Sequence, residues 1–314
     1  MTRDPLSAGD IIAERRFAYA KAAAEEGNWG AAAEVFEQAL ELAPHWAAAR
    51  FALGEAREKL GDFEAAAQAF RETLVADPAD AQGAAARLAL IGRGDAPGAL
   101  PQAYVARLFD DYAPRFDKHL TGNLRYRAPA VIAGALSAIA PGRRFVSALD
   151  LGCGTGLMGE PLRARVGRLA GVDLSAAMIA KTRGRGIYDE LIIGDAVAPM
   201  RERPSALDLI AAADALVYIG DLAPLFDAVA RTLTSDGLFA FSVETCEDGF
   251  KLKPTMRFAH SRSYVETTAR EVGLRLLLVR SASTRREAGA DAPGLICVVG
   301  RAERTVGGSP ATVG

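Results

Sequence analysis

The sequence has little cysteine, little histidine and no strong excess of charge. Its three cysteines, Cys153, Cys246 and Cys297, are too few and too widely spaced for a disulfide scaffold or a zinc site. The 37 Lys and Arg residues nearly balance the 39 Asp and Glu residues, and the net charge is -2. This balance argues against a nucleic-acid-binding protein of the basic-patch kind. Three histidines leave few candidates for an imidazole base.

Long apolar runs are also missing. No run approaches the roughly 18 residues that a transmembrane helix needs, so we expect no membrane partner. The first ten residues, MTRDPLSAGD, have no apolar core behind their positive charge, so we expect no secretory signal. Together with the sparse cysteines, these features predict a cytoplasmic protein in a reducing compartment.

The composition changes along the 314 residues, a length that suggests about two domains. The first hundred residues contain 30 alanines, which predicts helices. They hold 10 Lys and Arg against 16 Asp and Glu, whereas the remainder holds 27 against 23. Three glycines and two prolines within Ile91–Pro101 indicate a linker between the two parts.

The first part contains an internal repeat. Four positions recur 34 residues apart, first as Gly27, Ala32, Phe36 and Pro44 and then as Gly61, Ala66, Phe70 and Pro78. This period is the length of a helix–turn–helix unit of the tetratricopeptide (TPR) type. Each glycine is expected to end a first helix, and each proline to stop a second one.

Two repeats rarely bury enough surface to stand alone, so Ala81–Leu90 is expected to add a capping helix. We predict a helical-repeat domain over residues 1–97. Its function is open between a groove for a partner protein and a packing or oligomerisation module. The acidic charge weakly favours a basic partner, but a solvated helix face explains it equally well.

In the second part, short apolar runs alternate with helical patterns, which predicts an α/β domain with a parallel sheet. The stretch FVSALDLGCGTGLMGE (145–160) indicates a strand, a turn with glycines at 152, 154 and 156, and a helix from about Leu157. Such a turn lets a ligand approach the backbone. Because Gly154, Gly156 and Gly159 also fit the dinucleotide-binding fingerprint, a nicotinamide-dependent oxidoreductase is an alternative.

Acidic residues at three predicted strand ends help to decide which ligand the glycine turn binds. Asp150 lies two residues before Gly152, where a carboxylate would repel a pyrophosphate but attract an α-amino group. Asp173 ends the next apolar run, 21 residues after Gly152, and its carboxylate can accept both hydroxyls of a ribose. Asp195 follows a third run, where it can take the amine of an adenine. A ligand with an amine, a ribose and an adenine, but no phosphate, is S-adenosylmethionine.

These residues carry a resemblance to class I S-adenosylmethionine-dependent methyltransferases over roughly Tyr104–Arg301. LDLGCGTG resembles motif I of that superfamily, VDLS the second motif and GDA the third, and LDLIAAADALVYIGDL (207–222) resembles its fourth-strand motif. YVARLFDDYAPRFDKHL (104–120) resembles the cap helix of small-molecule methyltransferases. The chain is also similar to a subgroup of predicted methyltransferases that carry TPR repeats. The similarity lies in the segments LRYRAP and RFAHSRSYV and in the repeats themselves.

The resemblance implies a Rossmann-like domain with a mostly parallel seven-stranded sheet and helices on both faces. It also implies a role for individual residues. Asp150 and the turn of Gly152, Gly154 and Gly156 would face the methionine end of the cofactor. Asp173 and Leu174 would hold the ribose, and Asp195 and Ala196 the adenine. Asp214 would lie near the methyl group, Tyr112 and Phe116 would close over the cofactor, and Arg127 would pair with its carboxylate.

Several of these residues have a structural alternative. Asp173 could cap a helix that begins near Ser175, and Asp150 could hydrogen-bond the glycine turn. Asp214 could also cap a helix, and Tyr112 and Phe116 could belong to the core. Cys153 is interpreted as a small packing residue of the turn and not as a nucleophile.

A general base helps only if the methyl acceptor is a hydroxyl or a protonated amine, and a carboxylic acid needs none. His260 is the preferred candidate base and His119 the second, whereas His45 belongs to the repeats. A basic cluster surrounds His260 and would suit an anionic acceptor, although a solvated loop explains it equally well; it contains Lys251, Lys253, Arg257 and Arg262.

The sequence therefore predicts a methyltransferase domain over residues 98–303 and a disordered tail over residues 304–314. The expected activity is methyl transfer to an oxygen or nitrogen of a small molecule. One alternative is a protein methyltransferase whose repeats hold the substrate chain, and another is a non-catalytic TPR scaffold. The oxidoreductase is disfavoured by Asp150 and by the lack of a separate substrate domain. No metal is expected.

Overall fold

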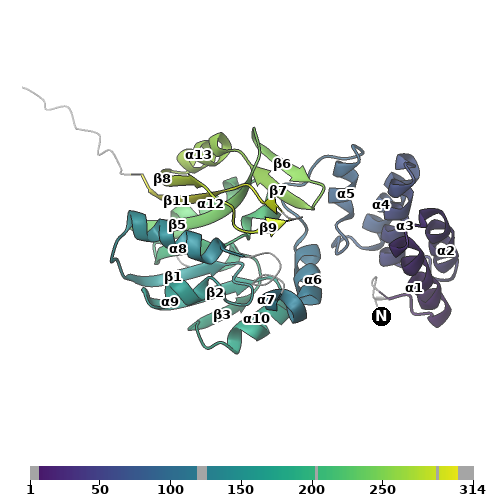
Figure 1. The fold of residues 1–314 in the computed structure, drawn as a ribbon, viewed down its shortest axis with the longest axis horizontal. Coiled ribbons are helices and arrows are strands. Elements are labelled where there is room, and N and C mark those ends of the chain that lie inside the picture. Colours follow the sequence, from purple (N-terminus) through teal and green to yellow (C-terminus); the bar gives the residue numbers. More distant parts are fainter. Residues whose placement is uncertain (1–6, 119–125, 202–203, 288–289, 303–314) are drawn as a thin grey trace, which may run out of the picture.

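The computed structural model describes residues 7–118, 126–201, 204–287 and 290–302. Two parts are visible in Figure 1: a layer of helices at one end and a sheet covered by helices at the other. The predicted tail (304–314) and His119 lie outside the described residues.

The first part consists of two helical hairpins and one further helix. The hairpins pair α1 (Ile11–Glu25) with α2 (Trp29–Leu42) and α3 (Ala47–Lys59) with α4 (Phe63–Ala76). Gly27 and Gly61 follow the first helix of each pair with φ near +80°, at +81° and +80°, a conformation that favours glycine. Phe36 and Phe70 are buried at equivalent places in the two hairpins. The repeat inferred from the sequence is thus present as two helix–turn–helix units.

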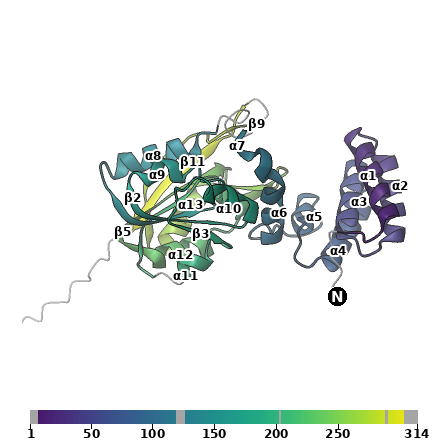
Figure 2. The ribbon, with the colours of Figure 1, turned by 90° about the horizontal axis from the view of Figure 1, so that it is seen from below.

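The helix expected within Ala81–Leu90 is α5 (Ala84–Leu90). One face of α5 packs on α4, where Leu88 joins Phe70. The other face reaches the second part of the chain, since Ala86 belongs to a core cluster with Val105, Leu252 and Phe258. Both views show α5 and α6 (Gln102–Tyr112) between the hairpins and the sheet (Figures 1 and 2).

The second part is built on a sheet with the order β3-β2-β1-β4-β5-β11-β8. Parallel pairing joins β1 (Phe145–Leu151), β2 (Val166–Asp173), β3 (Glu190–Ile193), β4 (Leu207–Ala212) and β5 (Leu233–Thr245). Antiparallel pairing adds β11 (Gly294–Arg301) and β8 (Leu274–Ser281). The predicted mostly parallel seven-stranded sheet is confirmed, and a hairpin of β6 (Phe250–Lys253) and β7 (Arg257–His260) extends it beside β5.

Helices cover both faces of this sheet, as predicted. Figure 2 shows α8 (Ala128–Ile139) and α9 (Gly159–Arg163) on one face, and α11 (Ala198–Arg201) and α12 (Ala223–Thr232) on the other. Each face has its own apolar core, one around Leu136 and Leu162 and the other around Phe226 and Phe239. The remaining helices are α7 (Phe116–Lys118), α10 (Ala176–Arg183) and α13 (Arg262–Glu271), and β9 (Arg286–Glu287) pairs with β10 (Ala290–Asp291).

Candidate ligand-binding site

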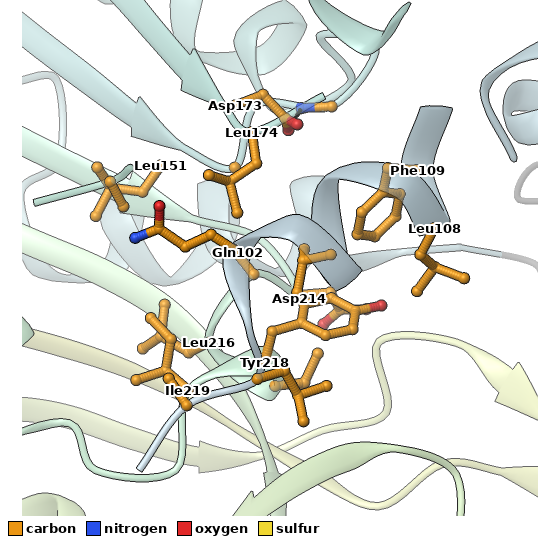
Figure 3. A pocket seen from close by; sticks show the side chains of 18 of the residues that line it. Gln102, Leu108, Phe109, Leu151, Asp173, Leu174, Asp214, Leu216, Tyr218 and Ile219 are labelled. Atoms are coloured by element: carbon orange, nitrogen blue, oxygen red, sulfur yellow. Dashed lines mark hydrogen bonds between the residues drawn. The ribbon is translucent and has the colours of Figure 1, made fainter. Parts of the chain in front are cut away.

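A pocket of about 930 Å³ opens where the parallel strands end. Its walls are the segments that follow β1, β2, β3 and β4, together with α6 and the turn after it. In Figure 3, Asp173 and Leu174 form one wall, and Asp214 and Tyr218 lie on the opposite side. The carboxyl edge of an open α/β sheet is the usual place for a ligand, and the volume suits one of cofactor size.

The glycine turn after β1 brings backbone to the pocket surface. Gly152 and Gly154 line the pocket and have φ values of +66° and +55°. A Cβ on Gly152 would lie 2.6 Å from the Cβ of Ala215, in the segment after β4. The turn therefore needs glycine at position 152 for its conformation and for its close packing. The predicted helix begins at Gly159, two residues later than expected, and Gly156 does not line the pocket.

Asp173 lies at the end of β2 with its carboxylate at the pocket wall. It accepts hydrogen bonds from the backbone N–H of Gly154 at 2.8 Å and of Ser175 at 2.8 Å. Burial raises the pKa of this carboxyl, and the two N–H groups oppose that rise. Ser175, not Asp173, supplies the N-cap of α10. A carboxylate has about four lone-pair positions, so each oxygen can still accept a hydroxyl from a ligand.

The segment after β3 places Asp195 and Ala196 in the lining of the same pocket as Leu174. The Asp195 carboxylate accepts a hydrogen bond from the Val197 N–H at 2.7 Å. It also accepts one from the Gln102 amide of α6 at 2.9 Å. The acidic ends of β2 and β3 therefore meet in the pocket, as the sequence predicted.

Asp214 lines the pocket after β4 in a left-handed conformation, with φ of +53°. Its backbone N–H donates to the Ser242 Oγ at 2.8 Å, and the Ser242 hydroxyl donates back to its carboxylate at 2.8 Å. Thr284 and Arg285 donate to its other carboxylate oxygen at 3.0 and 3.2 Å. These four bonds hold Asp214 in a conformation that most residues avoid.

A second carboxylate, Glu244, links the basic residues of this region. It is 5 % exposed and pairs with Arg285, with Lys253 at 2.8 Å and with Arg257 at 3.8 Å. Arg257 and Arg285 line the pocket. Arg285 and Glu244 were missed by the sequence analysis because no motif surrounds them, and only the pairing of distant segments brings them together.

The helices α6 and α7, with the turn between them, form a cap that contacts the segments after three strands. Gln102 of α6 bonds Asp195 after β3, and Asp110 of α6 accepts from the Ser175 hydroxyl at 2.6 Å after β2. Asp117 of α7 accepts a hydrogen bond from the Thr155 hydroxyl of the glycine turn after β1. Tyr112 and Phe116 line the pocket, with ring centroids 5.2 Å apart. The cap is thus hydrogen-bonded to the segments that follow β1, β2 and β3.

Two residues that were predicted to contact the ligand are not among those that line the pocket. Asp150 is fully buried and faces Tyr188, whose hydroxyl donates to its Oδ2 at 2.6 Å. Burial raises the pKa of the Asp150 carboxyl to about 7. Arg127 is exposed at the start of α8, pairs with Asp291 at 3.3 Å and does not line the pocket. Neither side chain is among the described residues that line this pocket.

His260, the preferred candidate base, is fully buried at the end of β7 and does not line the pocket. Its Nε2 lies 2.9 Å from the Ile219 carbonyl oxygen and 3.0 Å from that of Gly220. Carbonyls only accept, so Nε2 carries the proton. Burial lowers the pKa of His260 to about 4. The geometry gives His260 a structural role as a donor to the loop after β4.

This placement predicts acid sensitivity. The folded-state pKa of His260 lies below its usual 6.5, so its contribution to stability is complete above pH 6.5 and is lost as pH falls towards 4. Because of His260, we expect the free energy of unfolding to fall by about 2 kcal/mol between pH 7 and pH 5. Urea unfolding of the wild type and of His260→Asn at both pH values measures this. An equal loss in the two proteins would refute it.

Among the described residues, no three His, Cys, Asp or Glu side chains gather as a metal-binding group. The same residues include no helix long and apolar enough to cross a membrane. The described residues that line the pocket include no histidine.

Comparison with known proteins finds a family match in each part of the chain. Residues 149–241 match the family described as "Methyltransferase domain", and residues 17–81 match "Tetratricopeptide repeat". A malonyl-(acyl-carrier protein) O-methyltransferase of Salmonella typhimurium is 28% identical over 138 residues, which cover 44% of this chain and 52% of that protein. The chain spans about half the length of the curated relatives it matches first.

Solved structures agree on the fold. A SAM-dependent methyltransferase of Leishmania major superposes with a TM-score of 0.50 at 19% identity, covering 62% of this chain and 81% of that one. The cyclase SpnF superposes with a TM-score of 0.52 at 15% identity, covering 64% and 96%. Because one neighbour is a cyclase, the fold alone does not fix the reaction.

Proposed function

We propose that this chain, which carries a class I methyltransferase domain behind tetratricopeptide repeats, transfers a methyl group from S-adenosylmethionine to an oxygen or nitrogen of a small molecule. The observation that carries the proposal is the convergence of Asp173, Asp195 and the glycine turn on one pocket. We further propose that the repeats bind a partner protein or mediate oligomerisation.

The pocket fits the cofactor by its own chemistry. Asp173 would hold the ribose hydroxyls, because both carboxylate oxygens retain capacity to accept. Asp195 and Ala196 would hold the adenine, and Gly152 and Gly154 would admit the methionine end close to the backbone. The Asp150 carboxyl, buried behind the turn, would act on that end only indirectly.

When bound, S-adenosylmethionine supplies an electrophilic methyl group on a positively charged sulfur. The chain's residues then bind and orient the reactants, and orientation alone can contribute roughly 7–11 kcal/mol to lowering the barrier. The cap, with Tyr112 and Phe116 at the pocket wall, would exclude water from the reacting groups once both reactants are bound. A pocket covered in this way favours a small acceptor over a protein chain.

Calorimetric titration of the full chain tests the cofactor assignment. We expect micromolar binding of S-adenosylmethionine and S-adenosylhomocysteine and none of NADH. Binding of NADH alone would favour the oxidoreductase, and binding of none of the three would favour the scaffold.

A further inference from the structure

The two ends of the pocket differ in charge. At the ends of β2 and β3, Asp173 and Asp195 are the charged side chains of the wall. Across the pocket, Arg257 of β7 and Arg285 of the segment after β8 line the wall, together with Asp214 after β4. Asp221 also lines this side, where it accepts hydrogen bonds from the Tyr264 hydroxyl and the Ala223 N–H.

The other end is balanced in charge. Arg285, Lys253 and Arg257 offset three carboxylates, Asp214, Glu244 and Asp221, so this end repels an anion less than the acidic end does. Arg285 lies deepest, 5 % exposed, and bridges the two carboxylates. Arg257 is 26 % exposed and its guanidinium lies 3.8 Å from Glu244, so it is the more accessible of the two arginines.

Arg257 is also held in place at the wall. Its guanidinium donates a hydrogen bond to the Tyr218 hydroxyl in the segment after β4, and the Tyr218 ring packs against Phe109 of the cap with centroids 5.4 Å apart. Figure 3 shows Tyr218 next to Asp214 below α6. A guanidinium fixed in this way is preorganised for a planar anion, because its N–H groups match the two oxygens of a carboxylate.

We infer that the methyl acceptor is a small carboxylic acid with an apolar body, whose carboxylate is bound by Arg257. This inference rests on the proposed function and deepens it. The apolar body would lie against the wall formed by Leu100, Val105, Leu108, Leu216 and Ile219. Arg285 is a positioning residue that holds Asp214 and Glu244 behind the acceptor.

The reaction of such an acceptor balances without a base. One carboxylate oxygen forms a bond to the methyl carbon while the carbon–sulfur bond breaks, and the electron pair of that bond stays on sulfur. A positive sulfonium and a negative carboxylate become a neutral thioether and a neutral methyl ester. No proton is transferred, which agrees with the position of His260 outside the pocket.

The test compares matched ligands and matched variants on the full chain. Octanoate and 4-phenylbutanoate are titrated against protein saturated with S-adenosylhomocysteine, each beside its neutral amide and its amine. Mass spectrometry with S-adenosylmethionine then detects the methyl esters. The variants are Arg257→Gln, Arg257→Lys, and Lys251→Gln as a control that removes the same charge from an exposed position on the same hairpin.

We expect each acid to bind at least about tenfold more tightly than its amide, as for a charge-assisted hydrogen bond. Arg257→Gln should abolish that preference, Arg257→Lys should retain part of it, and Lys251→Gln should leave it unchanged. Affinity for S-adenosylhomocysteine should stay the same in all three variants.

Acids that bind no better than their amides or amines would overturn the inference, as would an unchanged preference in Arg257→Gln. Failure of the wild type to bind S-adenosylhomocysteine would instead overturn the proposed function and the inference with it. The two failures are therefore distinguishable.

Discussion

Replacing Asp173 by alanine is expected to weaken binding of S-adenosylmethionine about 10- to 150-fold. The change removes charge-assisted hydrogen bonds to the ribose worth about 1.5–3 kcal/mol. It also removes the acceptor that holds the Gly154 and Ser175 N–H groups, so the glycine turn loses its anchor to β2. Calorimetric titration of the purified variant measures the effect.

Asp208 provides a matched control for that experiment. Like Asp173 it is 9 % exposed and accepts two backbone N–H bonds, from Val146 at 2.7 Å and Ser147 at 2.9 Å. It lies on β4 near the start of β1, away from the pocket. Asp208→Ala should lose stability without losing cofactor affinity. Equal affinities in the two variants would show that Asp173 has only a structural role.

Deleting residues 1–97 is expected to destabilise the remaining domain by about 2–5 kcal/mol, the range for emptying a large core site. The deletion removes α5, and with it Ala86, Ala89 and Leu90 from the cluster that covers Leu252 and Phe258 on the β6–β7 hairpin. Because this hairpin carries Arg257, we also expect weaker acceptor binding.

A shorter deletion, of residues 1–76, serves as the comparison. It retains α5 and Asp80, whose carboxylate accepts from the Ala84 N–H at 2.6 Å and the Ala85 N–H at 3.1 Å. Leu88→Gln would make the newly exposed face of α5 polar. Urea unfolding should find this protein more stable than the 98–314 fragment. Equal stability would support the boundary at residue 97 and a purely peripheral α5.

The parts of the fold that follow local rules were predictable from the sequence. The spacing of Gly27 and Gly61 indicated the hairpin turns, and both glycines have the positive φ that such turns require. Short apolar runs that alternate with helical patterns indicated the parallel strands of the sheet. The carboxyl ends of parallel strands lie at one edge, so Asp173 and Asp195 had to come close once each was placed at a strand end.

Features that depend on tertiary packing were not predictable. His260 was a candidate base because it follows the fifth strand, where the related fold usually builds acceptor pockets, but the pairing of β7 with β5 buries its ring against the loop after β4. Asp150 sits on a strand whose neighbours determine that it faces Tyr188. Arg285 and Glu244 lie 41 residues apart in sequence, and no local pattern reveals that they form an ion pair.

The most direct test of the central claim, that this pocket binds S-adenosylmethionine through its acidic strand ends, is a crystal structure with S-adenosylhomocysteine. We predict both ribose hydroxyls within hydrogen-bonding distance of the Asp173 carboxylate, the adenine beside Ala196, and the homocysteine end over Gly152 and Gly154. A ribose turned away from Asp173, or a ligand bound outside this pocket, would contradict it.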